Sequence, residues 1–367
     1  MIPGVDYTEF FSPVATDTTV RTVIAIAIYR QGEGWTIEMI DIEAAFLNAE
    51  LDSDRPIFAE WPEGMVELGY ITEEERKRFC IQLTRPMYGG VDVPRLFMKT
   101  LWRYLTQKMN MTQSLVDPCL YYWKNAAGEV ILMAVVHVDD ILLVGKKETI
   151  EKFKSELKKR FNISDLGQLK KHLGVWYDWR TDDNGETYIV ASMTKLEDEI
   201  VEAFETSTGK MVKKTETPGY PNKFLSKNEG KPVKMTEYRS MVGKIMYLMT
   251  KLAPDLANPA RELAQHLSNP GEEHWKALER LVGHIKSKVY EGLTYRKPKE
   301  LRAISFVDSD YAKNTDDRKS ISSGLHTIGG TLVNWESKTQ HVVTLSSTEA
   351  EYIRLAKGAC ENNLSQC

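Results

Sequence analysis

Two apolar runs flank a pair of acids near the middle of the chain, between Val130 and Gly145. Both runs are rich in β-branched and aliphatic residues and are bounded by turn residues, which predicts two buried strands joined as a hairpin. Asp139 and Asp140 then stand at the hairpin tip. Two interpretations are open: an ordinary turn, where Asp is common, and a divalent-cation site, because hard cations prefer carboxylate oxygens. A third carboxylate elsewhere would favour the cation site.

A second alternating segment, residues 35–42, reads as a strand that ends at an acid, Asp41. Asp41 is a candidate for the third carboxylate. It would serve equally well as the N-cap of the following segment, residues 42–48, because Asp is a favoured capping residue. Both interpretations of Asp41 are kept at this point.

The rest of the chain alternates between helical and strand patterns. Ser346 and Glu349 fit a capping box at the start of the last helix. Glu351 lies two residues further and points elsewhere, so it is free to face Asp308, which ends a strand. Asn269 is expected to cap a helix that has Pro270 in its first turn. Apolar positions predict helices over 20–29, 96–109, 150–161, 196–204, 238–252 and 275–289, and strands over 303–308, 325–328, 331–335 and 341–345. A charge run predicts a short helix with a solvated face over 71–79, after a charged turn at 52–55.

Composition narrows the class of protein. A chain of 367 residues is long enough for two or three domains, and 42% hydrophobic with 27% charged residues is typical of a globular protein. The net charge of -4 argues against coating nucleic acid by bulk charge, although a local basic groove remains compatible with it. The four cysteines form no C-x-x-C pair, so neither a disulfide framework nor a zinc site is indicated. No signal peptide or membrane span is expected.

Several short motifs occur together in a characteristic order. They are Met39-Ile-Asp-Ile-Glu-Ala-Ala-Phe-Leu-Asn48, Met87-Tyr-Gly89, His137-Val-Asp-Asp140, His172-Leu-Gly174 and Leu345-Ser-Ser-Thr-Glu-Ala-Glu-Tyr352, preceded by an Asp-Tyr-Thr-Glu stretch at Asp6. Over nearly its whole length the sequence resembles the reverse transcriptase and RNase H part of a copia-type retrotransposon polyprotein. The resemblance implies an α+β right-hand polymerase with fingers and palm over 1–180, a mostly helical thumb and connection over 181–300, and a truncated RNase H-like domain over 301–367.

The resemblance also implies roles for single residues. Asp41, Asp139 and Asp140 match the catalytic carboxylates of the palm, which bind two Mg²⁺ ions, with Mn²⁺ as an alternative. The positions that match nucleotide contacts are Phe46, which would bar a ribose 2′-hydroxyl, and Tyr88 with Gly89. The positions that match the primer grip are Leu173 and Gly174, and those that match the first two RNase H carboxylates are Asp308 and Glu351.

The function expected from this resemblance is RNA-directed DNA polymerisation. The partners would be an RNA or DNA template, a DNA primer and deoxynucleoside triphosphates, without a membrane, in the cytoplasm, a virus-like particle or the nucleus. Three departures favour an alternative, an inactive remnant that only binds primer–template. Val91 and Asp92 stand where the family has a basic or amide residue, a basic segment is missing at the start, and the chain ends before further RNase H carboxylates. RNase H activity is therefore expected to be absent.

Overall fold

The computed structural model describes residues 11–51, 56–221, 223–288, 291–311, 318–342, 344 and 346–364, with the side chains of 357–364 excepted. The Asp-Tyr-Thr-Glu stretch, the charged turn at 52–55 and Leu345 lie outside the described residues. The chain divides into two compact units, Met1–Ala15 with Ile37–Gln168, and Thr16–Thr36 with Leu169–Cys367. The expected domain boundaries at residues 180 and 300 separate fingers and palm, thumb and connection, and the RNase H-like domain, and they stay a prediction.

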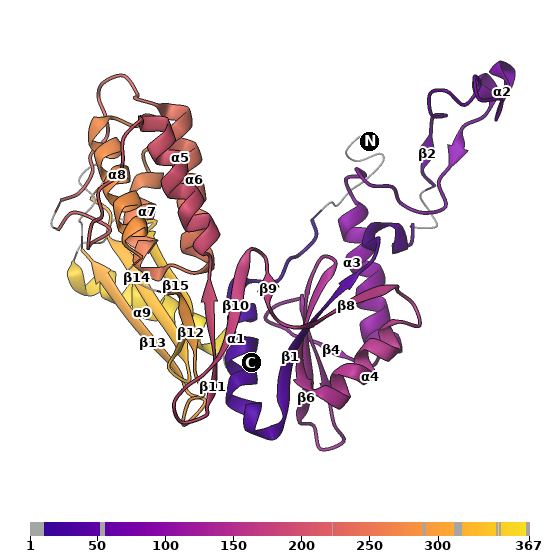
Figure 1. Cartoon of the computed structure of the whole chain (residues 1–367), viewed down its shortest axis with the longest axis horizontal. Helices are drawn as coiled ribbons and strands as arrows, with labels where there is room; N and C mark the ends of the chain where they lie inside the picture. The colour runs from indigo at the N-terminus through magenta and orange to yellow at the C-terminus, as the bar shows by residue number, and fades with distance from the viewer. Residues whose placement is uncertain are drawn as a thin grey trace. The chain divides into compact units, whose positions relative to one another are not determined.

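A six-stranded sheet forms the centre of the first unit (Figure 1). Its order is β4-β5-β6-β7-β1-β8, so β1 lies beside the hairpin strand β7. The predicted hairpin is confirmed, because β6 and β7 pair antiparallel with His137 opposite Asp140. β1 pairs antiparallel with β8. The strands span Thr112–Gln113 (β4), Leu120–Lys124 (β5), Val130–His137 (β6), Asp140–Lys146 (β7), Trp35–Ile42 (β1) and Ile163–Gln168 (β8).

Helices α3 (Val93–Arg103) and α4 (Lys147–Leu157) stand beside this sheet in Figure 1. A π-helical turn, Tyr104–Lys108, continues α3. Both predicted helices are confirmed, and each begins three residues earlier than expected. The early start of α3 follows from Pro94, which is well tolerated in a first turn because its missing N–H would have no partner there. The fully buried Phe153 lies on the core side of α4.

The charged segment 71–79 is confirmed as a short helix, α2 (Glu73–Arg78). Thr72 caps it: its hydroxyl accepts a hydrogen bond from the Glu75 N–H at 3.2 Å, and the Glu75 carboxylate accepts one from the Thr72 N–H at 2.8 Å. All of its side chains are exposed, as expected for a solvated face. Two short strands, β2 (Phe58–Ala59) and β3 (Ile81–Gln82), pair antiparallel next to it.

A buried cation joins α4 to the sheet. Only 3% of the Lys154 side chain is exposed, and its ammonium group contacts the carboxylates of Glu38 on β1, Asp165 on β8 at 2.8 Å and Glu151 at 3.1 Å. Burial alone would lower the pKa of Lys154, but hydrogen bonds to Asp165, Glu38 and Glu151 outweigh it and raise that pKa. Lys154 thus stays charged and ties together the two strands at this edge.

The second unit contains a group of helices and a four-stranded sheet ordered β12-β11-β10-β9. The predicted helices over 20–29, 196–204, 238–252 and 275–289 are found, with somewhat different ends. The elements are α1 (Asp17–Tyr29), α5 (Thr194–Thr208), α6 (Met235–Lys251), α7 (Ala257–Ala264), α8 (Glu272–Ser287), β9 (Lys171–His172), β10 (Val175–Thr181), β11 (Thr187–Ser192) and β12 (Leu293–Tyr295).

The expected N-cap of α8 is wrong. The helix begins at Glu272 after Gly271, whose N–H donates to Nδ1 of His274 at 2.8 Å. Asn269 lies two residues before the cap, and its side chain contacts Asn228 instead: its Oδ1 accepts from the Asn228 amide at 3.4 Å, and its amide donates to the Asn228 carbonyl at 2.7 Å. Helix α7 was not expected, since its eight residues carry too few apolar positions to show a clear period.

The last sheet of the second unit has the order β13-β14-β15, over Ala303–Asp310, Ile321–Ile328 and Thr331–Thr339. Helix α9 (Ser347–Leu364) follows, and Ser346 caps it by accepting from the Glu349 N–H at 3.1 Å. The strand expected over 341–345 is wrong for its described residues, which form a bend after β15. In the part of the chain that the structure describes, no helix is long and apolar enough to cross a bilayer.

Candidate functional site

The end of β1 and the tip of the β6–β7 hairpin are joined by a backbone hydrogen bond. The N–H of Ile42 donates to the carbonyl of Asp139 at 2.9 Å. This contact brings Asp41 beside the acid pair, although about a hundred residues separate them in the sequence. Asp41 and Asp140 are half-buried and Asp139 is exposed. The three acids therefore meet at one edge of the sheet and remain accessible to a ligand.

The hairpin turn that carries Asp139 has an unusual conformation. Val138 has φ of 59°, in the left-handed region that β-branched residues rarely adopt. Positive φ at the first central position alone of a two-residue hairpin loop is typical of a type II′ turn, where Gly is usual at that position. Strain of this kind is concentrated at functional sites, because surrounding contacts must hold it in place.

The acids repel one another. Burial raises the pKa of Asp41, and the charges of Asp139 and Glu43 raise it further. Burial likewise raises the pKa of Asp140, followed by the charges of Asp139 and Asp41. Asp41 is not a helix cap: the next helical turn, Ala45–Asn48 (η2), begins after Ala44 and has no side-chain cap. The capping interpretation of Asp41 is therefore wrong.

The chemistry of these acids suits a hard divalent cation, which prefers carboxylate oxygens. Within the described residues, none of the three forms an ion pair with a lysine or arginine, so their charge is uncompensated. The described residues nevertheless contain no group of three His, Cys, Asp or Glu side chains in the arrangement of a formed metal site. The donor atoms fit the ion, and the side chains would have to turn toward a common centre to hold it.

Two of the expected nucleotide contacts lie together. The ring of Phe46 is 5.6 Å from that of Tyr88, centroid to centroid, and 6.3 Å from that of Phe97. Tyr88 is largely exposed, so the pair presents an aromatic surface to solvent. Gly89 follows with φ of 94°, a conformation that favours glycine, and no atom lies within 4 Å of the position that a Cβ would take.

Two arginines that the sequence did not single out hold the turn that carries Phe46. Arg85 donates to the carbonyl of Leu47 at 3.3 Å, and Arg160 donates to that of Asn48 at 3.2 Å. The Asn48 amide in turn donates to two carbonyls just before the turn, at 2.9 and 3.1 Å. Nothing in the sequence pattern marks these arginines, because their partners are backbone atoms distant in the chain.

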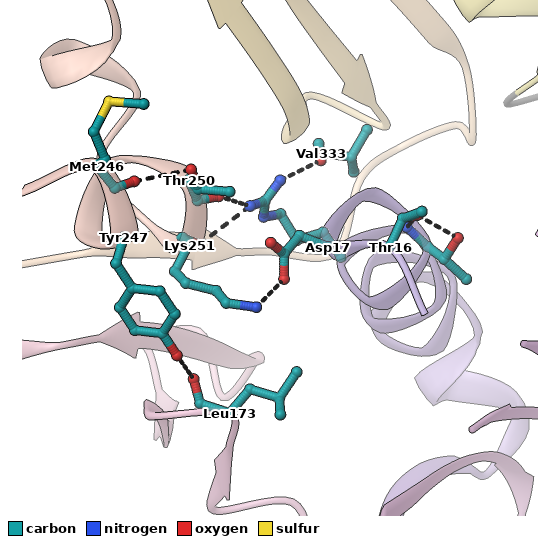
Figure 2. Close-up of polar contacts among 10 residues, drawn as sticks. Thr16, Asp17, Leu173, Met246, Tyr247, Thr250, Lys251 and Val333 are labelled. Carbon is teal, nitrogen blue, oxygen red and sulfur yellow. Dashed lines mark hydrogen bonds and ion pairs between the residues drawn. The ribbon is translucent and has the colours of Figure 1, made fainter. Parts of the chain in front are cut away.

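The expected primer-grip residues form a tight turn between β9 and β10, in the second unit. Leu173 and Gly174 both have positive φ, of 46° and 79°, which is typical of a type I′ hairpin turn. Figure 2 shows the Tyr247 hydroxyl of α6 pointing at the carbonyl of Leu173, to which it donates a hydrogen bond at 2.9 Å. This turn is therefore braced by a helix of the same unit.

Asp308 lies on the face of the last sheet that α9 does not cover. Gln340 hydrogen-bonds both Ser309 on β13 and the carbonyl of Ala350 on α9, so α9 covers the sheet face that carries Ser309. Side chains alternate between faces along a strand. Asp308, next to Ser309, accordingly lies on the opposite, exposed face. That Glu351 faces Asp308 stays a prediction, although α9 covers the other face of this sheet.

Comparison with known proteins identifies the family of this chain. The family model of reverse transcriptase (RNA-dependent DNA polymerase) matches residues 1–214. The retrovirus-related Pol polyprotein from transposon TNT 1-94 of Nicotiana tabacum is 30% identical over 95% of the chain, and that from transposon RE1 of Arabidopsis thaliana is 30% identical over 98%. A putative transposon Ty5-1 protein of Saccharomyces cerevisiae is 27% identical over 88% of the chain and is matched along its whole length, 100%.

The chain belongs to the reverse transcriptase family, and its mixed α/β fold is consistent with such a domain. Its homologues are copia-type retrovirus-related Pol polyproteins of transposons, as the motifs predicted. The chain spans 26% and 23% of the length of the two plant relatives, so it corresponds to about a quarter of each polyprotein.

Proposed function

We propose that this chain is an RNA-directed DNA polymerase that extends a DNA primer on an RNA or DNA template with deoxynucleoside triphosphates. The observation that supports it most is the meeting of Asp41 with the hairpin acids, joined by the hydrogen bond from Ile42 to Asp139 at 2.9 Å. Residues 1–180 would form the fingers and palm, 181–300 the thumb and connection, and 301–367 an RNase H-like tail.

In this proposal the three acids form the cation site, with Asp41 and Asp140 held by strands and Asp139 by the strained turn. Mg²⁺ bound there would lower the pKa of the primer 3′-hydroxyl and stabilise the charge of the triphosphate. Phe46 would close the space beside the sugar C2′ and so select deoxynucleotides. Tyr88 and Gly89 would form the surface beside the nucleotide, and the turn at Leu173 and Gly174 would hold the primer end.

Primer extension tests the proposal. The full chain is incubated with a labelled DNA primer on an RNA template, deoxynucleoside triphosphates and Mg²⁺. We expect extension by the wild-type chain and its loss, by about 10³-fold or more, in Asp140→Asn. An exposed carboxylate on the β10–β11 turn gives the control, Asp183→Asn, which should extend normally. No extension by a folded wild-type chain, with Mg²⁺ or Mn²⁺, would refute polymerase activity.

A second function, binding of primer–template without extension, is favoured by the loop before α3. Asp92 is 7% exposed at the start of that helix, and its Oδ1 has no hydrogen-bond partner in the described structure. An acid stands there where the resemblance implies a basic or amide residue. Gel-shift binding of the duplex by a chain that does not extend it would support this second function.

A further inference from the structure

The second unit contains a cavity of about 670 Å³ between α1, α6, α7 and β15. This volume lies in the usual range of small-molecule sites. Trp335 contributes an aromatic surface, and Met246, Met249 and Ala264 form an apolar wall. None of these residues belongs to the proposed polymerase site.

Two guanidinium groups line this cavity, and both hydrogen-bond to uncharged acceptors. Arg21 is 5% exposed and its guanidinium lies 3.8 Å from the centre of the Trp335 ring. It donates to the carbonyls of Val333 at 2.9 Å, Thr250, and Lys251 at 3.3 Å.

The second guanidinium has only hydroxyl and amide acceptors. Arg261 donates to Ser337 at 3.2 Å, Asn258 at 2.9 Å and Thr339 at 3.4 Å. In each arginine, three of the five guanidinium N–H groups are engaged in this way, so donors remain for a ligand. Burial lowers the pKa of both arginines, and the charges of Asp17 near Arg21 and of Glu262 near Arg261 offset this effect only in part.

The carboxylates of the cavity, in contrast, already have cationic partners. Asp17 is paired with Lys251 at 2.6 Å, and Figure 2 shows the Lys251 ammonium group pointing at it. Glu336 is paired with Lys338 at 2.7 Å and with Arg354. The acids are therefore compensated, whereas neither Arg21 nor Arg261 has a carboxylate partner among the described residues.

We propose that this cavity binds the phosphate group of a nucleotide through Arg21 and Arg261, with the rest of the nucleotide against the apolar wall. The planar guanidinium matches the oxygens of phosphate and can bind two at once. A buried cation without an anion is costly, and a bound phosphate would remove that cost. The cavity is larger than phosphate alone requires, which is why a nucleotide is favoured. Such a nucleotide can be free or part of a nucleic acid strand.

Equilibrium binding in the presence of EDTA tests the assignment, because a cation-dependent polymerase site does not contribute under those conditions. The probes are dAMP, deoxyadenosine and a single-stranded DNA of 12 nucleotides. We expect dAMP or the DNA to bind to the wild-type chain and deoxyadenosine not to bind. Arg261→Met should weaken binding by about tenfold. Binding of dAMP identifies a free nucleotide as the ligand, and Arg261-dependent binding of the DNA alone identifies the strand backbone.

Two variants make the outcome unambiguous. Arg280 on α8 also donates to uncharged acceptors, Gly219 at 3.0 Å and Thr217, but it does not line the cavity. Arg280→Met is therefore the matched control and should bind normally. Gln265→Glu adds a negative charge to the lining at nearly constant shape and should weaken binding even if Arg261→Met misfolds. Unchanged affinity in a folded Gln265→Glu or Arg261→Met chain, or no Arg261-dependent binding of any probe, would overturn the proposal.

Discussion

At the scale of single residues, two of the clustered acids lower the stability of the folded chain. Asp41 and Asp140 each have a raised pKa, caused first by burial and then by neighbouring carboxylates. A carboxyl with a raised pKa binds its proton more tightly in the folded chain than in the unfolded one. The free energy of unfolding therefore falls as pH rises from the ordinary Asp value through the raised one. The cost is fully present once the pH is above the raised pKa values.

Replacing Asp140 with Asn should accordingly stabilise the chain at pH 7, by roughly 0.2 to 1 kcal/mol after allowance for solvent screening. The gain should shrink as pH is lowered toward the ordinary Asp value, where the wild-type carboxyl is also neutral. Urea unfolding at several pH values measures it, with Asp183→Asn as an exposed control. If Asp140→Asn were less stable than the wild type at pH 7, the carboxylate would be making a favourable contact instead.

Added Mg²⁺ gives a related prediction that needs no turnover. A cation held by the three acids should raise the melting temperature of the wild-type chain, because a ligand of the folded state stabilises it. The shift should be smaller in Asp140→Asn, which lacks one charge. NaCl at equal ionic strength is the control for general screening. Equal shifts in both chains would place the bound Mg²⁺ elsewhere.

Phe46 carries the prediction about substrate choice. Phe46→Val would open the space that the ring closes beside Tyr88, so the ratio of ribonucleotide to deoxynucleotide incorporation should rise by about tenfold or more. Single-nucleotide extension with each triphosphate measures the ratio. Phe58→Val, at an exposed position on β2, is the control. An active Phe46→Val chain with the wild-type ratio would make Phe46 an ordinary packing residue.

At the scale of elements, the ion cluster around Lys154 holds the strand that carries Asp41. The pairing of β1 with β8 is irregular between Met39 and Ile40. Lys154 donates hydrogen bonds to Glu38, which precedes this irregularity on β1, and to Asp165, which lies opposite it on β8. Removing the ammonium group leaves Glu38 buried without its partner, and breaking a buried pair from one side is strongly destabilising. Replacing both Lys154 and Glu38 with apolar residues leaves neither charge of this pair buried, so much of the lost free energy of unfolding should be recovered.

We therefore expect Lys154→Met to lose about 3 kcal/mol of unfolding free energy, measured with urea. Glu38→Met combined with Lys154→Met should recover a large part of it. The control is Lys159→Met, since Lys159 is 63% exposed and pairs only with Glu156 on the surface. A Lys154→Met chain as stable as Lys159→Met would show that the cluster is not important for the fold.

Strong periodic patterns allowed most of these elements to be predicted. The hairpin, β1 and the long helices follow from apolar spacing, and the acids follow from their positions at strand ends. Local competition was harder to foresee. Asn269 contacts Asn228 and does not cap α8. The left-handed backbone conformation of Val138 is not indicated by any pattern in the sequence. The arginines at the Phe46 turn bind backbone carbonyls, which any sequence provides.

At the scale of the whole molecule, chain order does not show which segments pack together. Helix α1 directly precedes β1, yet it belongs to the second unit, where Arg21 bonds the carbonyl of Val333 across 312 positions of sequence. A contact of this range is invisible to periodicity, so the cavity around Arg21 and Arg261 could not be predicted. The same is true of strand faces, which depend on the register between β13 and β14.

The faces of the last sheet determine what the C-terminal segment can do. Asp308 shares its face with Phe306, which is 59% exposed, while α9 covers the other face. Two-metal cleavage needs carboxylates around ions about 3.5 to 4 Å apart, and α9, the helix that carries Glu351, does not lie over the face of Asp308. The chain should therefore not cut the RNA of an RNA–DNA hybrid. A uniformly labelled hybrid with Mg²⁺ or Mn²⁺ measures this, and Asp308→Asn controls for contaminating nuclease. Fragments made by the wild-type chain but not by Asp308→Asn would show that the two carboxylates meet after all.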